Sequence, residues 1–578
     1  MELLCAMFKP SSLGAPDRLG YSRAMAHLRP LTELPTHDVA NQPPPFEGVN
    51  WWSSDVALRE ATVREGGGWA QSQLEAFGER VGSAEVTAWG FEANRNRPEL
   101  LPFDRYGQRI DEVRYHPSYH ALMTLAIEAG VHSVAWTSER GGHVAHAAFE
   151  FLMTQAEPGV CCPLSMTYAV VPALRHQSEL AQAWVPKLTA KHYDPRACPA
   201  EHKLGVTMGM AMTEKQGGSD VRANTTKAHA LGAGGPGAEY ELVGHKWFCS
   251  APMSDAFLTL AQAPGGLSCF LVPRWRPDGT RNRFFIQRLK DKLGDRANAS
   301  SEIEYAGTWA QMLGEEGRGV PTIIEMVQHT RLDCVVSPAA MMRQSVANAC
   351  WHAAHRGAFG KLLIDQPLMR AVLADLALES EAATALALRV ARSFDDAGGD
   401  DPEPARLFSR LATPLAKYWL NKRAPELVYE AMECHGGAGF IEEGVMPRVF
   451  RQSPLSSIWE GSGNVICLDV LRAIGREPAC VEALMTELRA GAGGDRRLDQ
   501  FVAGIADRMT RPIEQRDARA LCESLGLALQ GSLLVRHGPS FVADAFCAGR
   551  LAGEGRCYGT LPAGVDIDAL IERAHPMS

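Results

Sequence analysis

The spacing of apolar residues changes twice along the chain, so the sequence predicts three blocks of structure. In the first block apolar residues recur every three or four positions, the period of a helix with one buried face. Beyond Lys203 alternating and β-branched runs replace that period, and beyond Pro321 the helical period returns. The helical runs of the first block are Val113–Ala135, Val144–Ala156 and Ser178–Leu188, and the strand runs are Tyr240–Val243, Ala256–Ala261, Leu267–Val272 and Phe284–Leu289. The pattern predicts a mainly α protein with a central antiparallel sheet or barrel.

These changes, together with the positions of proline and glycine, divide the chain into five predicted regions. They are a Pro-rich N-terminal arm at 1–50, an N-terminal α-helical domain at 51–203, a middle β-barrel domain at 204–320, a helical-bundle domain at 321–478 and a C-terminal helical extension at 479–578. Long bundle helices are predicted over Thr322–Arg356, Gln366–Ser393, Glu403–Cys434 and Ser457–Ile474. A glycine-rich linker at 490–494 is predicted to precede the last helical segment.

Composition excludes several classes of protein. With 46% hydrophobic and 22% charged residues, the chain has enough apolar content for a large core, which excludes general disorder. The formal charge of −9 excludes a chain-wide polycation built for nucleic acid. The 14 cysteines are scattered without a CxxC pair, which indicates reduced thiols and a cytoplasmic protein. No apolar run reaches the ~18 residues that a membrane span requires.

Two patterns invite a functional interpretation that their context does not support. The glycine-rich run at 232–237 lacks the Lys-Ser/Thr of a phosphate loop and does not stand between a strand and a helix, so a hairpin tip is predicted there. Histidine pairs at helical spacing, His116 with His120 and His352 with His355, have no acidic third ligand at a recognised spacing, and HExxH is absent. No metal site is therefore predicted.

Two segments near the start of the β region carry candidate chemistry. Residues 210–221 join a short apolar strand to a loop rich in glycine and small hydroxyls, which suits the polar edge of a flat ring or a pyrophosphate as well as a simple turn. In the strand 244–250, Phe248 and Ser250 share one face, so Phe248 can pack on a ring while Ser250 bonds its edge. An ordinary half-buried strand explains the second pattern too and, for this segment taken alone, is the favoured interpretation.

A third segment, residues 457–464, holds a lone carboxylate. Glu460 stands between a tryptophan and a Gly-Ser-Gly turn, and partial desolvation there would raise its pKa toward the range of a general base. The alternative is a carboxylate at a helix start, stabilised by the N-terminal amides.

In this order and spacing, the three segments resemble the motifs of the acyl-CoA dehydrogenase family of flavoproteins. The matching stretches are Met212–Asp220 (M-T-E-x-x-x-G-S-D), Phe248–Ser250 and Trp459–Val465, with Val465 in place of the usual isoleucine. Arg356–Gly360 with Gln366, and Gly436–Phe440, are similar to two further family motifs. From about Asn41 to the C-terminus the chain resembles the AidB, or alkylation-response, branch of the family, notably in Thr213–Asp220, Arg288–Gly294 and Ile458–Asn464.

The resemblance implies an acyl-CoA dehydrogenase-like fold and a homotetramer that binds FAD non-covalently. Thr213 and Ser219 would contact the flavin ring and pyrophosphate region, and Phe248 with Ser250 would line the ring. Arg356 and Gln366 match positions that reach the FAD of a neighbouring subunit. The full set of cofactor residues implied in this way is Met210, Met212, Thr213, Gly218, Ser219, Phe248, Ser250, Arg356, Gln366, Gly461 and Asn464.

The activity implied by the resemblance is α,β-dehydrogenation, with Glu460 as the catalytic general base and hydride transfer to the flavin. The expected substrate is an acyl-CoA thioester, or an alkylating agent if the protein serves the adaptive response to DNA alkylation. An alternative from another class is a flavin-containing protein that shields double-stranded DNA and has only vestigial dehydrogenase activity. A purely structural oligomer without cofactor is a third.

Charge bears on the DNA alternative. Residues 481–578 hold 11 arginines and no lysine against 13 acidic residues, a net charge of −2, so the extension lacks the overall positive charge that phosphate contacts favour. Local clustering of arginines could still create a DNA-binding face. The candidates are Arg472, Arg476, Arg489, Arg496, Arg497, Arg508, Arg511, Arg516, Arg519 and Arg550.

Overall fold

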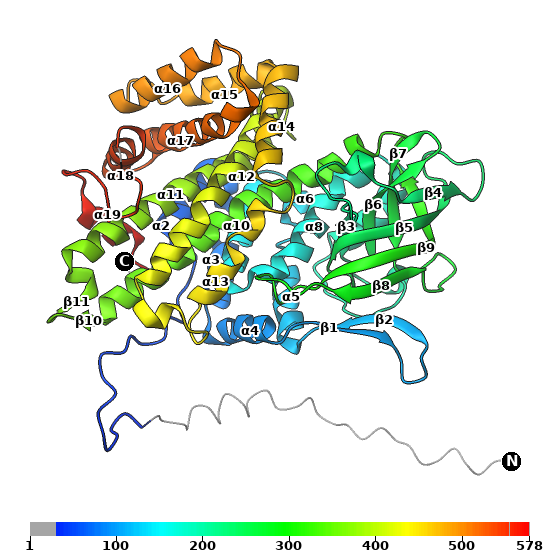
Figure 1. The fold of residues 1–578 in the computed structure, drawn as a ribbon, viewed down its shortest axis with the longest axis horizontal. Coiled ribbons are helices and arrows are strands. Elements are labelled where there is room, and N and C mark those ends of the chain that lie inside the picture. Colours follow the sequence, from blue (N-terminus) through cyan, green and yellow to red (C-terminus); the bar gives the residue numbers. More distant parts are fainter. Residues whose placement is uncertain (1–30, 554, 577–578) are drawn as a thin grey trace.

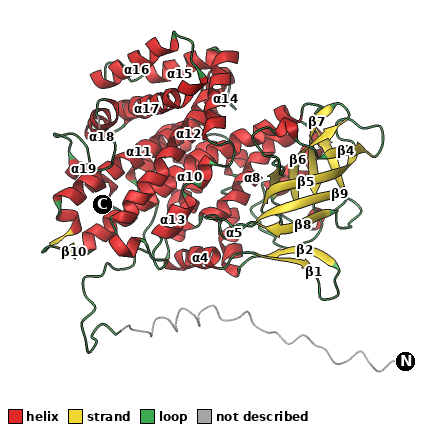
Figure 2. Ribbon diagram, viewed as in Figure 1, coloured by secondary structure: helices red, strands yellow, loops and turns green. Residues whose placement is uncertain are grey.

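A computed structural model describes residues 31–553 and 555–576 of the chain (Figure 1). The first thirty residues of the predicted Pro-rich arm lie outside the described part. Helices form one end of the molecule and the strands of the β domain the other (Figure 2). Within the described residues, no helix combines the length and the apolar character that crossing a membrane requires.

The N-terminal region is helical, as predicted, but it also contains a hairpin that the sequence pattern did not reveal. Its strands β1 (Glu99–Phe103) and β2 (Arg109–Arg114) pair antiparallel. Because Val113 belongs to β2, the helix predicted over 113–135 is wrong at its start, and the observed helix occupies 117–129, ending at Gly130 in the left-handed conformation. The helices are α2 (Val56–Thr62), α3 (Gln71–Val81), α4 (Ala84–Arg95), α5 (Pro117–Ala129), α6 (Val134–Thr137), α7 (Gly142–Ala156), α8 (Pro158–Leu174) and α9 (Ser178–Leu188).

The middle region is a closed barrel. Neighbouring strands pair in the order β6-β4-β5-β9-β7, and β7 pairs with β6 again, while β3 adds to β6 and β8 to β9. Most pairs are antiparallel, as predicted, but β3 and β4 run parallel to β6. The strands are β3 (Met208–Ala211), β4 (Lys227–Ala230), β5 (Glu239–Ser250), β6 (Ala256–Ala263), β7 (Gly266–Pro273), β8 (Phe284–Leu289) and β9 (Ser300–Leu313). The glycine-rich run 232–237 lies between β4 and β5, at the predicted hairpin tip.

The bundle consists of long helices at the predicted places, with one correction. Its helices are α10 (Gly319–His355), α11 (Pro367–Asp396), α12 (Pro402–Glu433), α13 (Met446–Gln452) and α14 (Gly463–Arg476), and a small hairpin of β10 (Gly357–Ala358) and β11 (Lys361–Leu362) joins α10 to α11. The helix predicted from Ser457 begins only at Gly463. Glu460 and Gly461 have φ values of +55° and +103°, which a right-handed helix does not accommodate.

The C-terminal extension packs against the bundle rather than standing apart from it. One apolar core includes residues of α7, α10, α11, α12 and the extension helices together. The extension comprises α15 (Ala479–Arg489), α16 (Arg496–Met509), α17 (Ala518–His537), α18 (Ser540–Phe546) and α19 (Ile567–Ala574). The predicted linker 490–494 is a tight turn between α15 and α16, where a Cβ added at Gly491 would lie 3.0 Å from the Ser532 hydroxyl.

Candidate active site

The Thr213 turn follows directly from β3 and folds back on β5. The backbone N–H of Trp247 donates to the carbonyl of Thr213 at 2.8 Å, which fixes the turn on the barrel. Gly218 closes the loop onto Thr213, since a Cβ at this glycine would lie 2.3 Å from the Thr213 Oγ1. The turn therefore requires glycine at this position for close approach, and it leaves Ser219 exposed at its end.

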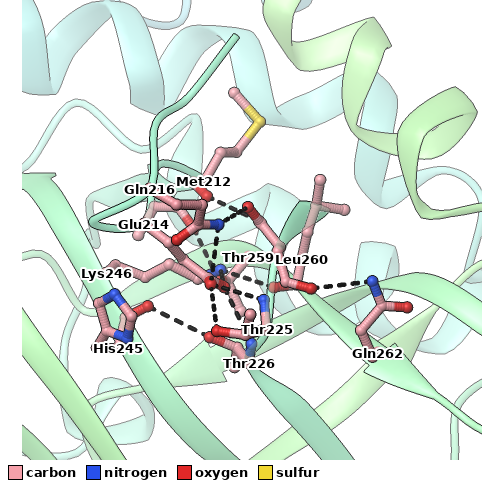
Figure 3. Close-up of polar contacts among 12 residues, drawn as sticks. Met212, Glu214, Gln216, Thr225, Thr226, His245, Lys246, Thr259, Leu260 and Gln262 are labelled. Atoms are coloured by element: carbon pink, nitrogen blue, oxygen red, sulfur yellow. Dashed lines mark hydrogen bonds and ion pairs between the residues drawn. The ribbon is translucent and has the colours of Figure 1, made fainter. Parts of the chain in front are cut away.

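A buried ion pair supports this turn from below (Figure 3). The Lys246 ammonium donates to Glu214 at 3.0 Å and to the Leu260 carbonyl at 2.8 Å, and both charged side chains are fully buried. The Glu214 carboxylate also accepts the backbone N–H groups of Thr225 at 2.7 Å and Thr226 at 3.1 Å. Burial alone would raise the pKa of Glu214, but Lys246 and these donors lower it to about 2 overall. The carboxylate thus ties both ends of the 213–225 loop to β5.

Phe248 and Ser250 lie at the end of β5, as the strand pattern predicted. The pairing of β5 with β9 shifts register between Lys246 and Cys249, so Phe248 stands at an irregularity that re-aims its side chain. Phe248 is 50% exposed, unusual for a phenylalanine in a barrel strand. The Ser250 hydroxyl lies 3.1 Å from that of Ser300 on β9.

The Glu460 turn precedes α14 and is held from two neighbouring helices. Arg331 of α10 donates to the Glu460 carbonyl at 3.2 Å, and Lys417 of α12 donates to the Gly461 carbonyl at 2.7 Å. The Glu460 Oε2 is buried without a hydrogen-bond partner. Burial raises the pKa of this carboxyl, opposed by Arg331, Thr330 and Lys417. The direction is the one that a general base operating near neutrality requires.

The fold brings the Thr213 side and the Glu460 side to the same apolar cluster. Met210 is buried in this cluster, and Met212 and Trp459 pack against it. Cys162 of α8 also belongs to this cluster, and burial is the main cause that raises the pKa of its thiol. A cysteine inside an apolar helix carries no sequence pattern that predicts such a place.

Asn464 and Gly461 lie around the start of α14. The Asn464 side chain is exposed, and its Oδ1 accepts a hydrogen bond from the Arg519 Nε of α17 at 2.9 Å. The C-terminal extension thus contacts a residue expected to close over the cofactor, a link that the sequence did not predict.

Arg356 and Gln366 lie apart from this cluster within one chain. Figure 1 places the β10–β11 hairpin, next to both residues, at the end of the molecule opposite the barrel. Arg356 donates to the Asn41 carbonyl at 2.6 Å, and the Gln366 amide donates to the Ala358 carbonyl at 3.0 Å. Both side chains therefore brace the hairpin, and the single chain does not bring them to the Thr213 turn.

The groups around the Thr213–Glu460 cluster suit a flat, conjugated ring. Phe248 offers an exposed aromatic face, and Ile458 is 64% exposed next to Trp459. The Trp459 Nε1 and the Glu460 Oε2 are buried polar atoms without partners, which native proteins seldom leave unsatisfied unless a ligand or water completes them. Hydroxyls at Thr213, Ser219 and Ser250 can bond a ring edge or a pyrophosphate. This donor set is compatible with a flavin.

A cavity of about 360 Å³ lies beside this cluster and was not predicted. It opens between β2, α5, the 193–207 segment and the loop after β5, and its walls include Tyr115, Tyr119 and Tyr193. Ala251, next to Ser250, forms part of its wall, but none of the predicted site residues does.

Most of the C-terminal arginines proposed for DNA binding are engaged with carboxylates. Six of the ten have an Asp or Glu oxygen within 4.0 Å: Arg472, Arg489, Arg497, Arg511, Arg516 and Arg550. Arg550 pairs with Asp375 and with Glu379, and all three side chains are largely buried. Phosphates would therefore have to compete with existing ion pairs at these positions.

Comparison with known proteins identifies the family. Residues 41–195 match the model of the adaptive response protein AidB N-terminal domain, 209–308 the acyl-CoA dehydrogenase middle domain and 317–475 the acyl-CoA dehydrogenase C-terminal domain. The Escherichia coli AidB protein is 44% identical over 89% of this chain and 94% of its own length. Acyl-CoA dehydrogenase family member 11 of Caenorhabditis elegans is 30% identical over 80% of this chain and 75% of its own.

Solved structures agree with this assignment. Caenorhabditis elegans ACDH-11 in complex with C11-CoA superposes with a TM-score of 0.81 and 26% identity, covering 91% of this chain and 95% of that one. A Bacillus anthracis acyl-CoA dehydrogenase in complex with FAD, 18% identical, shares the fold with a TM-score of 0.61 over 79% of this chain and 82% of its own. The chain belongs to the acyl-CoA dehydrogenase family of oxidoreductases, in its AidB branch, and it has the fold predicted from the three motifs.

Proposed function

We propose that this protein is an FAD-dependent acyl-CoA dehydrogenase of the AidB type. The observation that carries the proposal is the Glu460 carboxylate. Its Oε2 is buried without a partner, and the neighbouring Trp459 packs against the apolar cluster that also contains Met210 and Met212 next to the Thr213 turn. A buried carboxylate with a raised pKa is suited to remove a weakly acidic proton, such as that on the α-carbon of a thioester.

In this proposal one group of residues binds FAD and Glu460 moves the proton. Thr213 and Ser219 hold the polar edge of FAD, and Phe248 with Ser250 lines the ring. When bound, FAD accepts the hydride that leaves the β-carbon of the substrate. Glu460 takes the α-proton, and the surrounding apolar side chains exclude water from the reacting atoms.

A homotetramer completes this proposal, because Arg356 and Gln366 do not reach the cluster of their own chain. The β10–β11 hairpin that they brace ends in Phe359, which is 99% exposed, and Leu368 nearby is 85% exposed. Such apolar tips favour burial against a second subunit. In that arrangement Arg356 and Gln366 would contact the FAD of the neighbouring subunit.

The substrate class is an acyl-CoA thioester. The support is the family and the C11-CoA bound by the structurally similar ACDH-11. A role in the response to alkylating agents rests on similarity to AidB alone. The DNA-shielding alternative has weaker support, since carboxylates pair with most of the C-terminal arginines.

The test is Glu460→Gln, which keeps the side-chain shape and removes the basic oxygen. We expect the variant to retain bound flavin and to photoreduce normally. Anaerobic bleaching by a panel of acyl-CoA thioesters should slow by about 10²- to 10⁴-fold, the usual contribution of a general base. Glu443→Gln, an exposed carboxylate in the preceding loop, is the matched control. Bleaching by substrate at the wild-type rate in Glu460→Gln would refute the assignment.

A further inference from the structure

Lys417 is a buried cation without a carboxylate partner. Its side chain is 1% exposed, and within the described part of the chain no carboxylate oxygen lies within 4.0 Å of its Nζ. Its ammonium donates a hydrogen bond to the Gly461 carbonyl at 2.7 Å, but this acceptor carries no formal charge to balance that of the lysine. An unpaired buried ammonium is costly, so its charge requires a physical explanation.

The surroundings of Lys417 point to Glu460. Burial lowers the pKa of Lys417, and the groups that act on it are Cys334 and Arg331 from α10, Glu460 from the turn, and Lys422 on its own helix. Arg331 pairs with Asp469 at 2.9 Å, a carboxylate that it shares with Arg410 and Arg472. Glu460 is the one carboxylate among these groups, and it lies next to Gly461, whose carbonyl Lys417 holds.

The same lysine shapes the turn that carries Glu460. Two consecutive left-handed residues, Glu460 and Gly461, are costly for the backbone, and for the non-glycine residue in particular. The carbonyls of these two residues accept from Arg331 and Lys417 respectively, so two buried cations from different helices hold the turn. Arg331 also pairs with Asp469, whereas Lys417 has no carboxylate oxygen within 4.0 Å among the described residues.

We propose that Lys417 is a positioning residue for Glu460: it holds the Gly461 carbonyl and supplies, together with Arg331, the positive charge that favours the ionised form of the Glu460 carboxylate. The inference rests on the proposed function of Glu460 as the base. Through Lys417, α12 would help to set the pKa of the Glu460 carboxyl, in addition to the effect of burial in the turn.

Three substitutions separate the two contributions of Lys417. Lys417→Met removes the charge and the donor, Lys417→Gln removes the charge but keeps an N–H donor, and Lys417→Arg keeps both. Lys203→Met is the matched control, because Lys203 is also a buried lysine but pairs with Asp255 in the barrel, away from Glu460.

The first readout is an infrared titration of the full-length, flavin-loaded protein. The carboxyl band of Glu460 is identified as the one missing in Glu460→Gln. We expect its midpoint to rise by about one pH unit or more in Lys417→Met and Lys417→Gln, and to stay near wild type in Lys417→Arg. The acid limb of the bleaching profile should move by the same amount.

The second readout is amide hydrogen exchange over residues 458–465. Exchange should rise about tenfold in Lys417→Met, equivalent to ~1.4 kcal/mol, and less in Lys417→Gln, which retains a donor. If Lys417→Met does not fold, the comparison of the Glu460 band midpoint between Lys417→Gln and Lys417→Arg provides the test. Midpoints unchanged from wild type in both charge-removing variants would overturn the proposal, as would an equal shift in Lys203→Met.

Neither readout requires turnover, so the two proposals fail in different ways. A wild-type protein that no acyl-CoA bleaches, but whose Glu460 band shifts in Lys417→Gln, would refute the dehydrogenase function and leave the role of Lys417 standing. Substrate bleaching that depends on Glu460, with no shift of the band, would do the reverse.

Discussion

Removing Lys246 should open the loop that carries Thr213, although the ion pair as a whole contributes little net stability. Burial lowers the pKa of Lys246, and the nearby Glu214 carboxylate partly offsets this decrease. The pKa of Lys246 is about 8, against an ordinary value of 10.5. For Glu214 the opposing effects leave a pKa of about 2 against an ordinary 4.5. Each difference corresponds to roughly 3 kcal/mol, and the signs are opposite at neutral pH.

The sign of each contribution follows from linkage. The lowered pKa of Glu214 stabilises the fold above pH ~4.5, and this stabilisation is lost as pH falls through about 2. The lowered pKa of Lys246 costs stability below pH ~8, and this cost disappears as pH rises toward 10.5. At pH 7 both apply and nearly offset each other, as is common for buried ion pairs.

Removing only one partner of the pair should cost far more stability than removing both. Lys246→Met leaves the Glu214 carboxylate buried and unpaired, at a cost of about 3–5 kcal/mol. The amides of Thr225 and Thr226, which donate to this carboxylate, should then exchange about 10²- to 10⁴-fold faster. The double variant Glu214→Gln with Lys246→Met removes both charges and should lie closer to wild type than the single variant does.

The assay is hydrogen exchange followed by mass spectrometry on the peptide that contains Thr225 and Thr226. Lys227→Met, an exposed lysine on the adjoining strand, is the control for loss of a surface charge. Exchange in Lys246→Met no faster than in Lys227→Met would refute the reasoning. If the increase in exchange in the double variant equalled the sum of the increases in the two single variants, the expected offset between the two buried charges would be refuted.

Two further predictions concern buried charges elsewhere. Burial is the main cause that raises the pKa of Glu150, whose side chain is 1% exposed, to about 8. Between pH 4.5 and pH 8 the folded state therefore keeps a proton that the unfolded state releases. The free energy of unfolding should fall by ~1.4 kcal/mol per pH unit across this range. Glu150→Gln should flatten this dependence, measured as the change in apparent Tm between pH 6 and pH 8, and an equally steep change in the variant would contradict it. Arg550→Met should leave the buried carboxylate of Asp375 without a cation and Glu379 with Arg423 alone, lowering the apparent Tm and speeding exchange in α18. Normal exchange there would show that the pairs do not hold the extension.

The sequence by itself determined the family, the kind of fold and the local shape of the motifs. Helical and strand periods depend on neighbouring residues, so the pattern placed α9 at Ser178–Leu188 and β8 at Phe284–Leu289 with the bounds that the structure has. The pattern also over-extended one bundle helix through Glu460, because apolar spacing does not report a reversal of φ.

Only the tertiary structure decided which distant residues support each motif. Lys246 lies 32 residues from Glu214, and Lys417 lies 44 residues from Gly461, with no pattern linking either pair in the sequence. Likewise the charge count of the extension could not show that Arg550 is consumed by carboxylates of α11, about 170 residues earlier. The physical reason is that a buried charge is governed by whatever the fold places within a few ångströms of it, and sequence spacing carries that information only within a single helix or strand.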